Sequence, residues 1–168
     1  GDSAILKTYF KPYAVCRWSH AAVDAVLELK HRHQLRVDEI ESIQVETFRE
    51  VTRLSNEQSS NTIAAQFSIQ FALAVALLYD RIGPAEVSDA QIHDPAILAL
   101  ARKVRVSVDD ALDREFPAKT MARVTIRTRR GEHRTTIEYP RGNPENPLTQ
   151  TELEAKFELL TRDLISDD

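Results

Sequence analysis

Three basic side chains stand close together near the start of the chain and have the chemistry to hold an anion. Lys11, Arg17 and His20 all lie within residues 11–20. Lysine and arginine donate charge-assisted hydrogen bonds to carboxylates, and histidine exchanges a proton near neutral pH. These types and spacings suggest a carboxylate-binding site. The alternative is a solvated group of cations without a ligand, because basic residues at helix starts are common.

The local sequence predicts that these side chains lie at the N-terminus of a helix. Pro12 cannot lie inside a helix and disfavours helical geometry at Lys11, so the segment before the helix should be extended. From residue 18 the apolar positions have helical spacing, with Ser19 as a plausible N-cap: Trp18, Ala21, Ala22, Ala25, Val26 and Leu29. The free N–H groups and the dipole of such a helix start favour anions.

Two further side chains in this region invite a chemical role. Cys16 lies within reach of His20, which could activate it as a nucleophile; the alternative is a thiol that serves packing or forms a wall of the site. His31 and His33 have an i, i+2 spacing that places them on different helix faces, so a metal site is not expected there. One cysteine also excludes a multi-cysteine zinc site and an internal disulfide.

Composition predicts one globular domain and narrows the classes of function. The chain has 168 residues, of which 42% are hydrophobic and 29% charged, and its formal net charge is −4. This balance predicts no nucleic-acid partner, and four glycines leave no glycine-rich loop for a nucleotide cofactor. The longest apolar run, residues 63–79, is interrupted by polar side chains and is shorter than a membrane span. The lone cysteine fits a cytoplasmic setting.

The remaining pattern predicts an α+β fold, a mainly antiparallel sheet with helices packed on one face. Strands are expected at 39–48 and 104–108, followed by a hairpin of 121–129 and 133–139 that turns at 130–132, with its arginine-bearing face toward solvent or another domain. Helices are expected at 63–80, closed by Gly83-Pro84, at 95–103, and from residue 150 to about 167. Residues 49–62 and 140–147 are expected to be loops.

A capping box marks the start of the last helix. Thr149 and Glu152 have the required spacing, and an apolar stripe follows them: Leu153, Phe157, Leu160 and Leu164. We expect this stripe to pack against another element.

Three stretches resemble one known family. The run KPYAVCRWSHAAVDAV, the helix AAQFSIQFALAVALL, and the loop YPRGNPENPL followed by ELEAKFELL are similar to the MmgE/PrpD family, which includes 2-methylcitrate dehydratase, cis-aconitate decarboxylase and iminodisuccinate epimerase. The resemblance implies that residues 9–168 are the C-terminal α+β lid domain and that residues 1–8 are a connector cut from a preceding all-helical domain. It also implies a homodimer without a cofactor or metal.

The resemblance further implies a lyase or isomerase that acts on small di- or tricarboxylates, with this lid alone inactive. By motif position, Lys11 and Arg17 would bind carboxylates, and His20 would be the acid–base or hydrogen-bonding group, with its pKa lowered by the helix N-terminus. Tyr13, Cys16 and Phe71 would form walls of the site.

One position departs from the family pattern. The family often has F-S-x-P-Y where this chain has Phe67-Ser68-Ile69-Gln70-Phe71, so a tyrosine hydroxyl is absent. This departure keeps a second interpretation open, a non-catalytic carboxylate-binding or dimerisation module with the same fold. A third, a nucleic-acid binder that uses the hairpin arginines, is disfavoured by the negative net charge.

Overall fold

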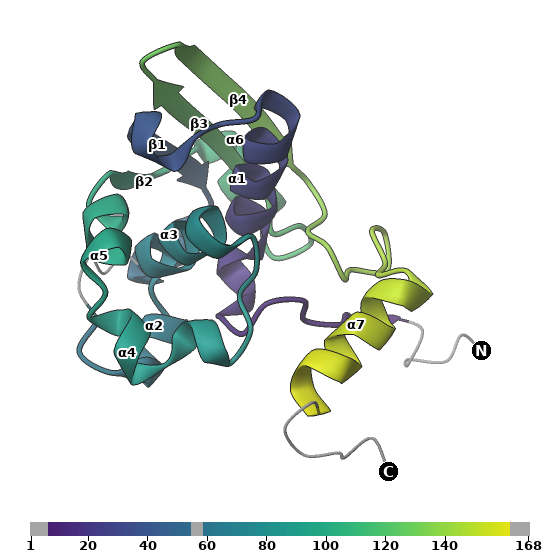
Figure 1. The fold of residues 1–168 in the computed structure, drawn as a ribbon. Helices are drawn as coiled ribbons and strands as arrows, with labels where there is room; N and C mark the ends of the chain where they lie inside the picture. The colour runs from purple at the N-terminus through teal and green to yellow at the C-terminus, as the bar shows by residue number, and fades with distance from the viewer. Residues whose placement is uncertain (1–6, 55–58, 162–168) are drawn as a thin grey trace.

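A four-stranded sheet forms the centre of the computed structural model, which describes residues 7–54 and 59–161. The strands follow the order β2-β1-β3-β4 (Figure 1). β1 pairs in parallel with β2 and antiparallel with β3, which in turn pairs antiparallel with β4. Their bounds are β1 Ile40–Thr47, β2 Val104–Val108, β3 Ala122–Thr128 and β4 Gly131–Ile137.

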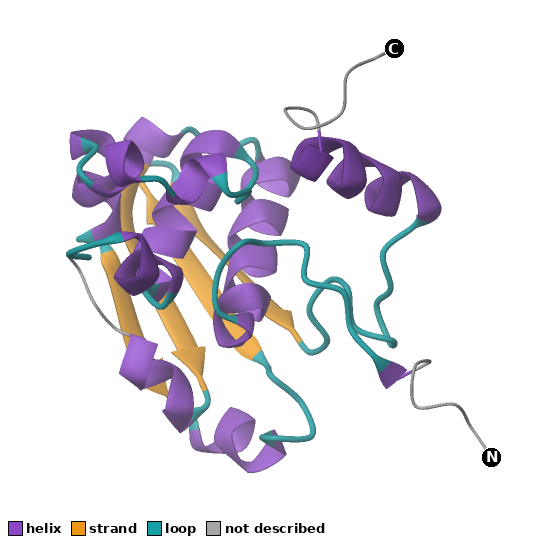
Figure 2. Ribbon diagram, turned by 90° about the horizontal axis from the view of Figure 1, so that it is seen from below, coloured by secondary structure: helices purple, strands orange, loops and turns teal. Residues whose placement is uncertain are grey.

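The main helices cover one face of this sheet, which confirms the predicted α+β class (Figure 2). α1 packs on β3 and β4, and α3 packs on α1 and α5. The helices are α1 His20–His33, α2 Thr62–Gln66, α3 Ile69–Tyr79, α4 Asp89–Ile92, α5 Pro95–Ala101, α6 Asp110–Glu115 and α7 Gln150–Thr161. Short 3-10 turns occupy Arg17–Ser19, Val37–Glu39, Arg49–Leu54 and Ala85–Val87. Among the described helices, none is long and apolar enough to cross a bilayer.

Strand alternation separates an apolar face from a charged one, as predicted for the hairpin. Val45 and Val124 are paired and fully buried beneath the helices. On the other face Arg123 contacts Asp109 at 2.5 Å, and Arg134 contacts Glu46 at 2.9 Å. Because these cations are matched by acids, the outer face of the sheet carries little unbalanced charge.

The structure corrects the predicted helix 63–80, which is two helices. Ser68 interrupts it, because its hydroxyl accepts the N–H of Phe71 at 3.1 Å and starts α3 as an N-cap. The helix also ends earlier than Gly83-Pro84, since Asp80 adopts a left-handed conformation with φ 59° and serves as its C-cap. The Ser68 hydroxyl and the left-handed backbone of Asp80 therefore set the two ends of α3, although the apolar pattern is continuous across Ser68.

The predicted loop 49–62 is partly ordered in the residues described there. Val51 and Leu54 lie buried in the 3-10 turn, and the Asn61 side chain caps α2 by accepting the N–H of Ala64 at 2.8 Å. Residues 55–58 lie outside the described part. The hairpin turn falls at 129–130, slightly before the predicted position, because Thr128 pairs with Gly131.

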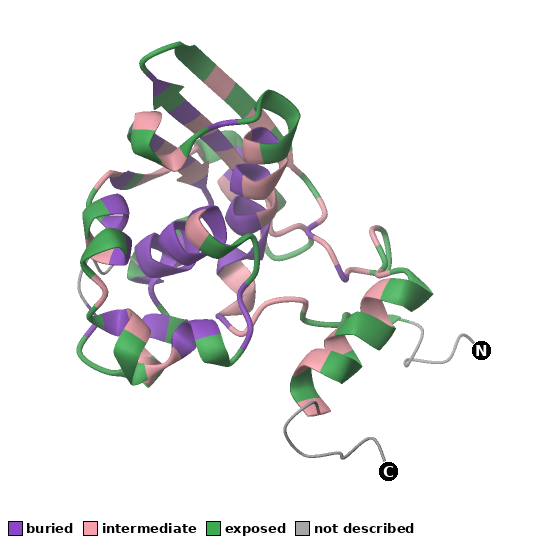
Figure 3. Cartoon of the chain, in the orientation of Figure 1, coloured by how far each residue is buried: buried purple, intermediate pink, exposed green. Residues whose placement is uncertain are grey.

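Helix α7 stands beside the body of the domain and has no buried residue (Figure 3). Its predicted capping box is confirmed, since the Thr149 N–H donates to Glu152 at 2.7 Å and the Glu152 N–H donates to Thr149 at 3.3 Å. Much of the apolar stripe is uncovered by the described residues, since Phe157 is 61% exposed and Leu160 is 45% exposed. Leu153 is half-buried, and Leu164 lies outside the described residues.

Candidate functional site

A hollow of about 450 Å³ separates α7 from the body of the domain. We call it the lysine hollow, because Lys11 and Lys156 line it from opposite ends of the chain. Its remaining lining residues come from the N-terminal segment, α2 and the segment before α4: Tyr13, Ala14, Thr62, Gln66, Pro84 and Val87. Among the residues that the structure describes, no carboxylate lines this space. The two ammonium groups are therefore not neutralised by a carboxylate of that lining.

Local backbone structure at Arg17–Ser19 decides where α1 begins. Ser19 occupies the N-cap position of α1, but its hydroxyl donates to the Cys16 carbonyl at 2.7 Å instead of accepting from the first turn of α1. A 3-10 turn at Arg17–Ser19 precedes α1, so His20 becomes its first residue. The helix therefore begins slightly later than the apolar spacing from Trp18 suggests.

His20 is fully buried behind the lysine hollow, at 0% exposure. Its Nε2 lies 3.3 Å from the carbonyl oxygen of Val15, and its Nδ1 has no hydrogen-bond partner among the residues described. Because a carbonyl only accepts, the neutral ring must carry its proton on Nε2. Nδ1 then keeps its lone pair, which makes it a buried acceptor without a donor.

The surroundings of His20 keep its imidazole neutral. The pKa of His20 is lowered to about 3, chiefly by burial and also by the positive charges of Arg17, Lys11 and Lys156, while the contact with Val15 acts in the opposite direction. The direction agrees with the expectation from the helix start, but the largest cause is burial.

Arg17 is held at the edge of the site by two segments distant in sequence. Its guanidinium donates to the Asn143 side chain and lies over the Tyr9 ring, 4.8 Å from the ring centroid. A second nitrogen of the guanidinium, Nη1, is buried without a hydrogen-bond partner among the residues described. Burial lowers the pKa of Arg17 as well. One donor of this side chain is therefore left for a ligand.

Tyr13 connects the lysine hollow to α1 and to the loop 140–147. Its ring meets the His20 ring edge-on at 5.1 Å, and its hydroxyl donates to Asp24. Asp24 also accepts the backbone N–H of Arg141 at 2.6 Å. Burial is the main cause that raises the pKa of both Tyr13 and Asp24. Sequence analysis missed Asp24, although it is a carboxylate one turn after His20 within an apolar helix.

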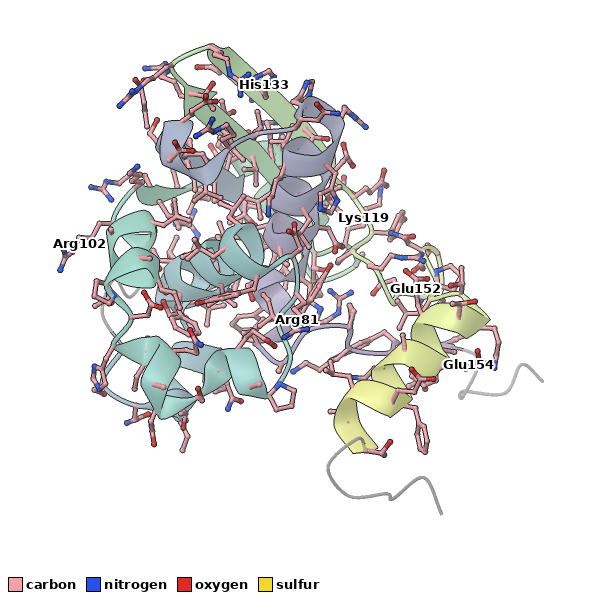
Figure 4. All side chains as sticks on the ribbon, viewed as in Figure 1. Arg81, Arg102, Lys119, His133, Glu152 and Glu154 are labelled. Carbon is pink, nitrogen blue, oxygen red and sulfur yellow. The ribbon has the colours of Figure 1, made fainter. Side chains whose placement is uncertain are left out.

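The side chain of Arg141 fixes the start of α7. It donates to Glu152 at 3.0 Å and to Asn146 at 3.1 Å. Glu152 lies in the first turn of α7 (Figure 4). These polar contacts at the N-terminus of α7, together with the Leu159 side chain that lies against Gly83, position the helix and with it Lys156.

Gly142 allows the N-terminal segment to approach the same loop. Its φ is +91°, and a Cβ atom would lie 1.9 Å from the carbonyl oxygen of Phe10. The Phe10 N–H donates to the Gly142 carbonyl at 2.9 Å. Only glycine satisfies both the backbone conformation and this contact.

The structure brings together some of the predicted site residues and leaves others apart. Lys11 and Tyr13 line the lysine hollow, whereas Arg17 and His20 are not among its lining residues. Cys16 is half-buried and does not line this hollow. Phe71 is buried within α3 and does not line it either.

Lys156 was missed by sequence analysis because nothing local distinguishes it from other helix-surface lysines. Within residues 7–54 and 59–161, no cluster of three or more His, Cys, Asp or Glu side chains has the arrangement of a metal site.

Comparison with known proteins identifies the family of this domain. No curated protein matches the chain closely enough to be a recognisable relative. The profile of the MmgE/PrpD C-terminal domain matches residues 13–168, which include α1, the whole sheet and α7. The chain therefore belongs to the MmgE/PrpD C-terminal domain family.

Proposed function

We propose that this domain forms one wall of the active site of a lyase or isomerase that acts on small di- or tricarboxylates. An N-terminal helical domain supplies the opposite wall, as the family membership suggests. The observation that carries the proposal is the lysine hollow, where two ammonium groups line a space that no carboxylate of the described residues lines. Such a space attracts polyanionic acids.

The reactions that fit this site begin at a carbon next to a carboxylate. Removal of a proton or loss of carbon dioxide there leaves negative charge, which spreads onto the carboxylate as an enolate-like species. Lys11 binds the carboxylate and stabilises this charge, and the free donor of Arg17 adds a second contact. Loss of water, loss of carbon dioxide and epimerisation all pass through charge of this kind.

His20 is the proposed acid–base or hydrogen-bonding group. Its neutral ring and unpartnered Nδ1 suit it to accept a hydrogen bond or a proton. Because the ring is fully buried, a substrate reaches Nδ1 only if Tyr13, which touches the ring edge-on, moves aside. Tyr13 is therefore proposed as the site wall that controls access to His20.

The test is turnover by this chain combined with a helical N-terminal domain of the family. We expect activity on at least one of methylcitrate, cis-aconitate and iminodisuccinate, and we expect His20→Gln to abolish it. The chain alone should turn over none of them, because half of the site is absent. If His20→Gln retains turnover, His20 is not required for the reaction. Full activity of the chain alone would contradict the proposal that the N-terminal domain supplies the opposite wall of the active site.

A non-catalytic carboxylate-binding or dimerisation module is the second candidate. Phe71 favours it, since the family pattern often has a tyrosine there. Phe71 is only weak support for this module, because it is buried in α3 and does not line the lysine hollow. Binding of the three acids without turnover of any would support this module. Sedimentation of the combined protein tests the proposed homodimer.

A further inference from the structure

Lys11 and Lys156 differ from Lys30, Lys103 and Lys119 in having no partner among the residues that the structure describes. Lys30 donates to Asp80 at 2.6 Å, and Lys103 donates to the Ile40 carbonyl at 2.5 Å. Lys119 is paired with Glu115 at 3.5 Å. Neither lysine of the hollow makes a hydrogen bond or ion pair with any residue in the described part of the chain.

The two unpaired ammonium groups belong to elements that meet only in the folded domain. Lys11 precedes α1, whereas Lys156 lies in the middle of α7, which is held by the contacts of Arg141 with Glu152. Placing two like charges beside one hollow costs free energy unless an anion compensates them. A compact anion meets one of them, but an acid with two separated carboxylates can meet both.

We infer that Lys156 binds a second carboxylate of the substrate, while Lys11 binds the first. This inference rests on the proposed function and extends it, because it makes α7 a specificity element that selects acids with at least two carboxylates. Lys156 reaches the hollow from a helix without buried residues. Binding of the substrate to Lys156 therefore also holds α7 against the body of the domain. A ligand that bridges α7 and the N-terminal segment therefore reduces the opening of α7.

The experiment titrates the chain with glutarate and with pentanoate, followed by NMR. These acids share a carbon count and differ by one carboxylate. We expect the wild-type chain to bind glutarate about tenfold more tightly than pentanoate, and we expect Lys156→Gln to remove that difference, because one partly solvated ion pair is lost. Hydrogen exchange of the α7 amides should slow with glutarate but not with pentanoate, and this slowing should disappear in Lys156→Gln.

Two control measurements separate the possible outcomes. Arg102→Gln removes an exposed positive charge on the opposite side of the domain from α7 and should leave glutarate binding unchanged (Figure 4). Inorganic phosphate, a compact anion, should bind more weakly than glutarate. Phosphate binding as tightly as glutarate would show that the hollow responds to total charge, which overturns the two-carboxylate inference.

The variants also distinguish failure of this inference from failure of the proposed function. If Lys11→Gln weakens glutarate binding and Lys156→Gln does not, the role of Lys156 is overturned and the proposed function stands. If the wild-type chain binds neither acid, carboxylate binding by this domain is wrong, and both proposals fail together.

Discussion

Acid should destabilise this domain through His20. The ring is fully buried with a pKa of about 3, whereas a histidine in an unfolded chain has a pKa of about 6.5. Between these values the unfolded chain binds one more proton than the folded domain at this position, so stability falls as the pH falls. The slope is about 1.4 kcal/mol per pH unit, or about 2 kcal/mol between about pH 6.5 and about pH 4.5.

The substitution His20→Gln removes this proton while keeping an N–H that can donate to Val15. The free energy of unfolding is measured by urea denaturation across the same pH range, for wild type and for His20→Gln. Comparing each protein with itself at about pH 8 cancels the packing cost of the substitution, because that cost does not depend on the titration of His20. His20→Asn serves as a second non-titrating variant if glutamine does not fit.

The expected result is a wild-type curve that falls more steeply with acid than either variant curve, by about 1.4 kcal/mol per pH unit below about pH 6. Parallel curves would refute the reasoning. They would mean that the imidazole is protonated in the folded domain, and the neutral ring with a free Nδ1 would have to be abandoned.

Three further predictions concern the parts that hold the site together. Gly142→Ala should lower the free energy of unfolding by about 2–4 kcal/mol, because a Cβ meets the Phe10 carbonyl at 1.9 Å, whereas Gly131→Ala, with open space around it, should cost about 1 kcal/mol. Glu152→Ala should speed hydrogen exchange of the α7 amides about tenfold by removing the capping box and the contact with Arg141, and Glu154→Ala, on the same helix, should not. Ser68→Ala should lower the urea midpoint by the equivalent of about 1 kcal/mol through loss of the α3 cap.

Each of these predictions can fail in a defined way. Equal losses for the two glycine variants would show that the contact with the Phe10 segment contributes nothing to stability. Unchanged exchange in Glu152→Ala would mean that contacts other than the capping box hold α7. If Ser68→Ala is as stable as wild type, the Ser68 cap is not what separates α2 from α3.

Much of the fold follows from patterns that act over a few residues. Alternation of apolar and polar side chains predicts the strand at 40–47 and the hairpin, because neighbouring residues of a strand point to opposite faces. The capping residues Asp94 and Thr149 mark helix starts because their partners lie within one turn. Where the prediction fails, at Ser68, a hydroxyl competes with an apolar run that is equally consistent with one long helix.

The candidate site depends instead on contacts between segments distant in sequence. The basic run of residues 11–20 is visible in the sequence, but nothing in it says that His20 is sealed behind Tyr13 or that Arg17 is held by Asn143. Lys156 enters the hollow only because α7 returns to the N-terminal segment. Periodicity shows which face of an element is turned inward. It does not show which other segment covers that face or how far burial shifts a pKa there, because both depend on distances that exist only in the folded domain.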